Sequence, residues 1–204
     1  RQMCIRDSHH AEKSLTRFEE LKRDYIIEMK NLSTTLGITE GQLECLIAFC
    51  ITFHDIGKLN KEWQKCANAL GSEPLAHVES MPAPPPHSTI SAYSLQKILA
   101  DFAGKSLGFS CFYALAHHHS VGSELIKPYE FISEWKQQVW EAMSKIWNTY
   151  PELKEIQLED IYPALDKPAR MPGKIPSLGS PREYVPYAFI SRMLRLSDRR
   201  SQSG

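Results

Sequence analysis

The sequence has no excess of charge of either sign, no Cys-x-x-Cys pair and no apolar stretch of transmembrane length. Its 24 Lys and Arg balance 24 Asp and Glu, so no global basic field attracts nucleic acid, and any DNA binding depends on local patches. The lack of thiol pairs argues against a structural zinc site. Five scattered cysteines and the lack of a signal peptide predict a cytoplasmic protein without a membrane segment.

Strand-like alternation and internal repeats are also missing, and helical periodicity predicts an all-α domain. About 200 residues suffice for one domain with a sizeable core. Prolines between residues 82 and 86 predict a loop over 71–86, and the Pro- and Gly-rich stretch 151–181 predicts a second loop with one short helix. The predicted helices are 10–36, closed by Gly37; one from the Thr39 capping box to His54-Asp55; a short one capped by Asn60; and 88–102, 106–119, 129–148 and 181–200.

The dipeptide His54-Asp55 follows the apolar run 46–53, which places two metal-binding groups at the end of a buried helix. An unpaired carboxylate there would be costly, and a metal ion would remove that cost. Gly57 is expected to end the helix in the left-handed conformation and to leave Lys58 free to reach an anion. The competing interpretation is a capped helix in which Asp55 only pairs with Lys58, and this segment alone does not separate the two.

The remaining histidines favour the metal interpretation. Imidazole is the commonest metal-binding side chain, and it is neutral enough at pH 7 to donate a lone pair. Histidines at helix ends around one Asp, with Asp198 late in the chain, form a set that holds one or two transition-metal ions. Besides His54, the histidines are His9, His10, His77, His87, His117, His118 and His119.

The order His, His-Asp, His, His-His, Asp along a helical chain resembles the HD phosphohydrolase superfamily. The branch it resembles is the CRISPR-associated HD nuclease, the nuclease module of the type I interference helicase-nuclease. The resemblance spans about residues 9–200 and implies an all-α HD-domain helical bundle over 9–204. The residues that carry it are 54–60 with Trp63-Gln64, His87-Ser88 with Ser91-Ala92, His118-His119-Ser120, and 196–199.

The resemblance also implies the roles of the site residues. Asp55 would bridge two divalent ions, and Asp55 and Lys58 would be the catalytic residues, with Lys58 neutralising charge on a phosphate. A histidine-rich shell favours Mn, Fe, Co or Ni over Mg. The implied ligands besides Asp55 are His10, His54 and Asp198 for one ion, and His87, His118 and His119 for the other.

The first histidine of the pattern has two candidates, His9 and His10. At about 100° per residue, His10 lies on the same side of the first helix as Phe18, Leu21 and Tyr25, the apolar stripe that should face the core. His9 falls on the opposite side. His10 is therefore the preferred ligand.

The run of three histidines is longer than the pair in the family pattern. Successive helical residues point about 100° apart, so all three cannot face one site. His118 and His119 match the pair because a small residue follows them. His117 is left as a supporting or packing residue.

The two ends of the chain look unlike natural termini. Residues 1–8 resemble the translation of a sequencing adaptor, which predicts a non-native leader that is not part of the natural fold. Residues 197–201 stop just after a family motif without a capping pattern. We therefore expect a fragment of a longer gene product, truncated at its C-terminus.

The implied function is a metal-dependent nuclease that cleaves single-stranded DNA in CRISPR type I interference, together with a helicase domain or subunit and the CRISPR surveillance complex. One alternative is an HD phosphohydrolase acting on nucleotides or cyclic dinucleotides, and another is a non-catalytic HD scaffold. A solvated charged face is an equally good interpretation of each basic residue taken singly. The basic candidates for DNA contact are Arg192, Arg195, Arg199, Arg200, Lys58, Lys61 and Lys65.

Overall fold

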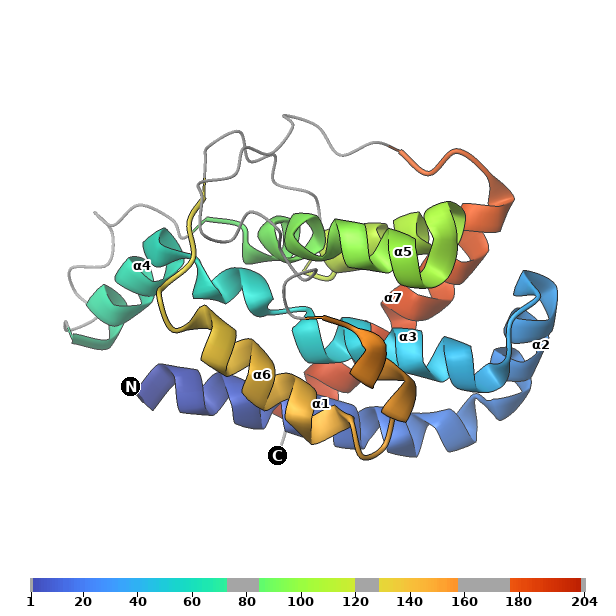
Figure 1. The fold of residues 1–204 in the computed structure, drawn as a ribbon, viewed down its shortest axis with the longest axis horizontal. Helices are drawn as coiled ribbons and strands as arrows, with labels where there is room; N and C mark the ends of the chain where they lie inside the picture. The colour runs from blue at the N-terminus through green and yellow to red at the C-terminus, as the bar shows by residue number, and fades with distance from the viewer. Residues whose placement is uncertain (1, 73–84, 120–128, 158–176, 203–204) are drawn as a thin grey trace.

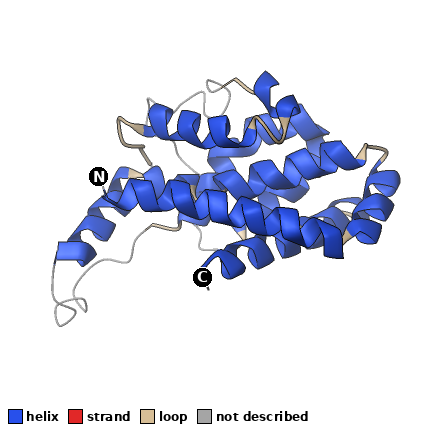
Figure 2. Ribbon diagram, turned by 90° about the horizontal axis from the view of Figure 1, so that it is seen from below, coloured by secondary structure: helices blue, strands red, loops and turns tan. Residues whose placement is uncertain are grey.

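The computed structural model describes residues 2–72, 85–119, 129–157 and 177–202, with the side chains of 2–9, 68–72 and 200–202 left out. All regular elements in these ranges are helices, which confirms the all-α prediction (Figure 2). In chain order they are α1 (Gln2–Asp24), α2 (Ile26–Leu36), α3 (Glu40–Phe53), the 3-10 helix η1 (Ile56–Leu59), α4 (Lys61–Ser72), α5 (His87–Ala116), α6 (Trp135–Ile146), the 3-10 helix η3 (Pro151–Glu155) and α7 (Pro181–Gln202).

Helix α3 runs through the middle of the molecule, with α1 and α6 on one side and α5 on the other (Figure 1). Every residue from Cys45 to Phe53 is buried. A helix that is apolar on all sides is stable only when other helices surround it. Its C-terminal end therefore delivers His54 and Asp55 into the interior, as the apolar run predicts.

The predicted helix 10–36 differs from the structure in two respects: α1 already begins at Gln2, and the structure divides the helix at Tyr25. Backbone bonds continue across the break, from Tyr25 N to Leu21 O at 3.1 Å and from Met29 N to Tyr25 O at 2.9 Å. No Gly or Pro marks this position. The Tyr25 hydroxyl instead accepts hydrogen bonds from Arg192 on α7, so a contact distant in sequence accompanies the bend.

The caps on either side of the α2–α3 connection are confirmed. Gly37 ends α2 in the left-handed conformation, with φ of 69°. Thr39 and Gln42 form the predicted capping box at the start of α3. No single described helix is long and apolar enough to cross a membrane, whereas α2 and the segment 40–59 pass that test only as a pair bent by 106°.

Helix α5 reverses direction at Gly104, where φ is 76° and ψ is 166°. A straight helix of 30 residues would be about 45 Å long, yet the rings of His87 and His118 at its two ends lie 5.6 Å apart. A Cβ on Gly108 would lie 2.6 Å from Leu99 O, so the two halves touch backbone to backbone. The prediction of two helices, 88–102 and 106–119, is thus right in substance.

Two predicted boundaries differ from the structure. The second half of α5 ends at Ala116, so the three histidines lie in the turn that follows and not inside the helix. Helix α6 begins at Trp135 and not at 129, because the preceding residues pair with the chain around Asn60. Lys61 N donates to Glu130 O at 2.8 Å, and Ile132 N donates to Leu59 O at 2.9 Å.

Gly57 has a different role from the predicted left-handed cap. Helix α3 already ends at Phe53, and Gly57 lies within η1 without a positive φ. Its N–H donates to Ser91 Oγ at 2.8 Å, and a Cβ there would lie 2.0 Å from His87 O. Glycine is required because η1 packs directly on the first turn of α5.

Replacing Gly57 with Ala is therefore expected to destabilise the protein by at least about 2 kcal/mol, since the added carbon meets backbone and not a movable side chain. Gly41→Ala is the matched control, because the nearest atom to its added Cβ is 3.9 Å away. That change is expected to be neutral or to stabilise the helix by up to about 1 kcal/mol. Urea unfolding of both variants is the measurement, and equal free energies of unfolding would contradict the close approach.

Candidate metal centre

Seven side chains from distant parts of the chain meet at one place in the bundle. Helix α1 supplies His10, the end of α3 supplies His54 and Asp55, and α7 supplies Asp198. The start of α5 and the turn after it supply the other three. The ligand atoms form two groups, each within 4.8 Å: the first is Asp55, His87, His118 and His119, and the second is His10, His54 and Asp198.

The carboxylate of Asp55 lies between the two groups and turns one oxygen toward each. Oδ1 lies 3.1 Å from His87 Nε2 and 3.8 Å from His118 Nε2, and His119 Nε2 is 4.0 Å away. Oδ2 lies 3.4 Å from His54 Nε2 and 3.8 Å from His10 Nε2. This is the placement that a carboxylate bridging two ions needs.

Asp198 completes the second group from α7. Its Oδ1 lies 2.9 Å from His10 Nε2 and 3.7 Å from His54 Nε2. The side chains of His54 and His118 are each only 1% exposed, whereas that of His119 is 43% exposed. The centre is therefore buried on the α3 side and open to solvent beside His119.

Backbone carbonyls fix the rings of two of the histidines. Nδ1 of His54 lies 2.6 Å from Ile51 O, and Nδ1 of His118 lies 2.6 Å from Leu115 O. A carbonyl oxygen only accepts hydrogen bonds, so each Nδ1 carries the proton. In the neutral rings Nε2 then holds a lone pair that faces the carboxylates, which is the arrangement found in histidine metal ligands.

Four buried ligand atoms of the centre have no hydrogen-bond partner within the described part of the chain. They are Nε2 of His54, His87 and His118, and Oδ1 of Asp55. Buried polar atoms without partners are rare, because losing water without replacement costs free energy. A divalent cation in each of the two ligand groups would satisfy all four, so the residues present fit metal binding. The mixture of imidazole and carboxylate ligands suits a transition metal.

The charge states also suit metal binding. Burial opposes ionisation of Asp55, but the charge of His54, the His118 and His87 rings beside its carboxylate, and the charge of Lys58 together hold its pKa well below the usual range. The pKa of Asp198 is lowered in the same way by His10 and His54.

The histidines of the first group respond mainly to burial, which lowers the pKa of His118. Burial, with the positive charges of His118 and His87, lowers the pKa of His119 to about 4. His54 differs: burial lowers its pKa, but Asp55, Asp198 and the Ile51 carbonyl together outweigh burial, so its pKa is raised. At neutral pH the carboxylates are charged, and His118 and His119 are free to donate lone pairs.

Lys58 pairs with Asp55, with 2.5 Å between Nζ and Oδ2. The ion pair of the competing interpretation is therefore present together with the seven-residue cluster. Trp63 and Gln64 support this region: Gln64 Nε2 donates to Lys58 O at 2.7 Å, and the Trp63 ring lies 5.7 Å from Lys58 Nζ. The edge of Trp63 also packs on His87, with 6.1 Å between ring centroids.

His117 belongs to neither ligand group. Its ring packs on Tyr113, with centroids 4.3 Å apart, and burial followed by the charge of Arg195 lowers its pKa. The side chain of His9 and all of His77 lie outside the described residues, so only His10 is placed in the centre.

The basic residues do not form one free face on α7. Arg192 donates to the Tyr25 hydroxyl at 3.1 and 2.9 Å, and Arg195 donates to His117 O at 2.7 Å. The side chain of Arg200 lies outside the described residues. Lys61 pairs with Glu130 and Lys65 with Glu62, so solvated ion pairs account for both lysines.

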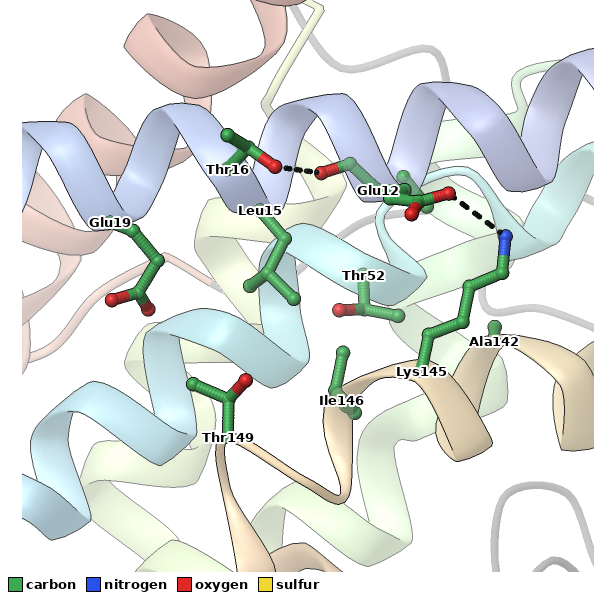
Figure 3. Close-up of a pocket in the computed structure, with 10 residues that line it drawn as sticks. Glu12, Leu15, Thr16, Glu19, Thr52, Ala142, Lys145, Ile146 and Thr149 are labelled. Carbon is green, nitrogen blue, oxygen red and sulfur yellow. Dashed lines mark hydrogen bonds and ion pairs between the residues drawn. The ribbon is translucent and has the colours of Figure 1, made fainter.

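A separate cavity of about 190 Å³ lies between α1, α3 and α6 (Figure 3). Its lining includes Thr52, Ile146 and the ion pair in which Lys145 Nζ lies 3.2 Å from Glu12 Oε2. None of the seven residues of the metal centre lines it. The cavity is therefore distinct from the candidate site, although Ala11 and Thr52 in its wall are close in sequence to His10 and His54.

Comparison with known proteins agrees with this architecture. The family described as "Cas3, HD domain" matches residues 9–171. Among solved structures, the CRISPR-associated Cas3 HD domain protein of Methanocaldococcus jannaschii is similar, with a TM-score of 0.53 and 18% sequence identity. The likeness covers 94% of this chain and 93% of that chain, and at this identity it concerns the fold alone. No curated protein sequence matches the chain.

The three consecutive histidines provide a direct test of the metal centre. His118→Ala and His119→Ala are each expected to lose bound metal, because each removes a lone pair aimed at Asp55. His117→Ala is expected to keep the metal and to lower stability by about 1–2 kcal/mol through lost packing on Tyr113. Metal content after loading with Mn²⁺ and dialysis is the measurement. Equal metal in the parent and in His118→Ala would refute the assignment.

Proposed function

Because the chain belongs to the Cas3 HD domain family, we propose that it is a metal-dependent nuclease that hydrolyses phosphodiester bonds in single-stranded DNA during CRISPR type I interference. HD domains of this kind are typically metal-dependent hydrolases. The observation that carries the proposal is the position of Asp55, whose two oxygens face two separate groups of histidines.

We propose that Asp55 is shared by two ions, one completed by His87, His118 and His119 and the other by His10, His54 and Asp198. This imidazole-rich set favours Mn, Fe, Co or Ni over Mg, which prefers oxygen ligands. When bound, such ions supply Lewis acidity for the phosphate and lower the pKa of a water molecule.

The protein's own groups then orient the histidine ligands and neutralise charge on the phosphate. The carbonyls of Ile51 and Leu115 hold the His54 and His118 rings in one tautomer, so their lone pairs need no reorientation. Lys58 places a cation beside Asp55, where it can also meet negative charge that develops on a phosphate oxygen. The opening beside His119 is the side from which a substrate would enter.

The partly buried centre favours a single strand as substrate. An unpaired backbone can bend toward Asp55, whereas a stiff duplex cannot follow such a path. A helicase domain or subunit, acting with the CRISPR surveillance complex, would supply that strand in the cytoplasm. Binding would depend on phosphate contacts from local cations, because the net charge is zero.

Removing the shared carboxylate tests the catalytic role. Asp55→Ala is expected to lower the rate of single-strand cleavage in Mn²⁺ by at least about 100-fold, because both ligand groups lose an oxygen. Far-UV circular dichroism should stay near that of the parent. Asp101→Ala is the matched control, since Asp101 is an exposed carboxylate on α5 that pairs with Lys97, away from the metal centre. Cleavage by Asp55→Ala at the parental rate would show that the site is wrongly assigned.

Substrate choice is tested with oligonucleotides of one sequence, single-stranded or as a blunt duplex, in Mn²⁺. The single strand is expected to be cut much faster, and its affinity should fall steeply with salt as bound phosphates exchange for counterions. Equal cleavage of both forms would contradict the proposed substrate. Preferential hydrolysis of free nucleotides or cyclic dinucleotides would favour the phosphohydrolase alternative, and absence of any metal would favour the scaffold.

A further inference from the structure

The second half of α5 ends without the residue types that usually cap a helix. Its last helical residue is Ala116, and His117 follows with φ of −112° and ψ of 16°, outside the left-handed conformation. The last carbonyls of a helix have no partners within it and need donors from elsewhere. This end matters because the next two residues are His118 and His119.

Arg195 on α7 supplies one of those donors. Its Nη2 lies 2.7 Å from His117 O, the carbonyl directly before His118. The bond is charge-assisted, and a cation at the C-terminal end of a helix is also favoured by the helix dipole. The half-buried Arg195 side chain therefore holds the start of the ligand-bearing turn.

The same arginine lies one turn before Asp198 on α7. Asp198 belongs to the second ligand group, while His118 and His119 belong to the first. A single side chain thus links the helix that carries one group to the turn that carries the other. The guanidinium is directed at the protein backbone, which argues against DNA contact, one of the two roles that the sequence left open for Arg195.

From this geometry we infer that Arg195 is a positioning residue of the metal centre, which sets the place of the His118–His119 turn relative to Asp198. The inference rests on the metal-binding role proposed above. Within the described residues, Arg195 forms no hydrogen bond or ion pair with a ligand side chain. It acts through the carbonyl of His117, so its removal should loosen the first ligand group while leaving every ligand in the sequence.

Arg192 provides a matched control on the same helix. It also donates to an oxygen, the Tyr25 hydroxyl, with distances of 3.1 and 2.9 Å. That contact lies at the α1–α2 break and involves no residue of the ligand-bearing turn. Loss of either arginine removes a charge and a hydrogen bond, but only Arg195 contacts the turn.

The experiment is a Co²⁺ titration of the full chain, followed by visible absorption, with His10→Ala in every sample so that binding reports on the first ligand group. Arg195→Met is expected to weaken Co²⁺ binding about tenfold, as is usual when a group supporting metal ligands is lost. Arg192→Met should stay within about twofold, and Arg195→Lys, which keeps a cationic donor, within about threefold. Melting of the metal-free variants gives their stabilities separately.

Arg195→Gln covers the case in which Arg195→Met does not fold, because its polar side chain suits the half-buried position but is too short to reach the carbonyl. It should show the same tenfold loss. Parental Co²⁺ affinity in either folded variant, or an equal loss in Arg192→Met, would overturn the positioning role while leaving the metal centre intact. Failure of the His10→Ala parent to bind Co²⁺ at all would overturn both this inference and the proposed function.

Discussion

The burial of one carboxylate among imidazoles is the constraint around which this bundle is arranged. Asp55 follows a helix that is apolar on every side, so its charge is kept from bulk water. An isolated charge in such a place would be strongly destabilising. The surrounding cations and lone pairs have to be brought there by other elements, and the arrangement of α1, α5 and α7 around α3 follows from that requirement.

Helix α5 shows how the backbone brings distant ligands to Asp55. His87 and His118 reach the same carboxylate from opposite ends of one helical element, which is possible only because the chain reverses at Gly104. The approach of η1 to the first turn of α5 imposes a second backbone condition, since any side chain at Gly57 would collide with His87 O. Two glycines thus hold ligands close together: Gly57 closely follows Asp55 in the sequence, whereas Gly104 is distant in sequence from every ligand.

The sequence predicts the helix caps and the buried run, because each depends on residues that are neighbours in the chain. The apolar run before His54, the Thr39 capping box and the left-handed Gly37 each follow from neighbouring residues, and all are present. The order of histidines and aspartates predicts which seven residues meet, because the family resemblance carries long-range information. The site roles of those residues remain predictions until metal and activity are measured.

Features set by distant contacts could not be predicted in the same way. The break at Tyr25 accompanies a hydrogen bond from Arg192, which is 167 residues away. Glycine is required at position 57 because the backbone of His87 lies too close for a side chain. The inward direction of Arg195 depends on where α5 ends, since Arg195 donates to His117 O. In each case the deciding partner is remote in sequence. Periodicity of a single chain gives no signal for such partners, and exposed arginines and buried ones look alike.

The arrangement of hydrogen-bonding groups separates a metal centre from a structural polar network. A network that serves stability pairs donors with acceptors. Here Nε2 of His118, which is an acceptor once Nδ1 is bonded to Leu115 O, faces the acceptor oxygen of Asp55 at 3.8 Å.

Protonation of the ring would remove this conflict between two acceptors. However, burial lowers the pKa of His118, and that of His119 is lowered to about 4, so both rings are neutral near pH 7. Lys58 satisfies only the other oxygen of Asp55. A bound cation is then what makes this set of side chains compatible with burial, which is the physical reason to place the metal, and not the Asp55–Lys58 pair alone, at the centre of the fold.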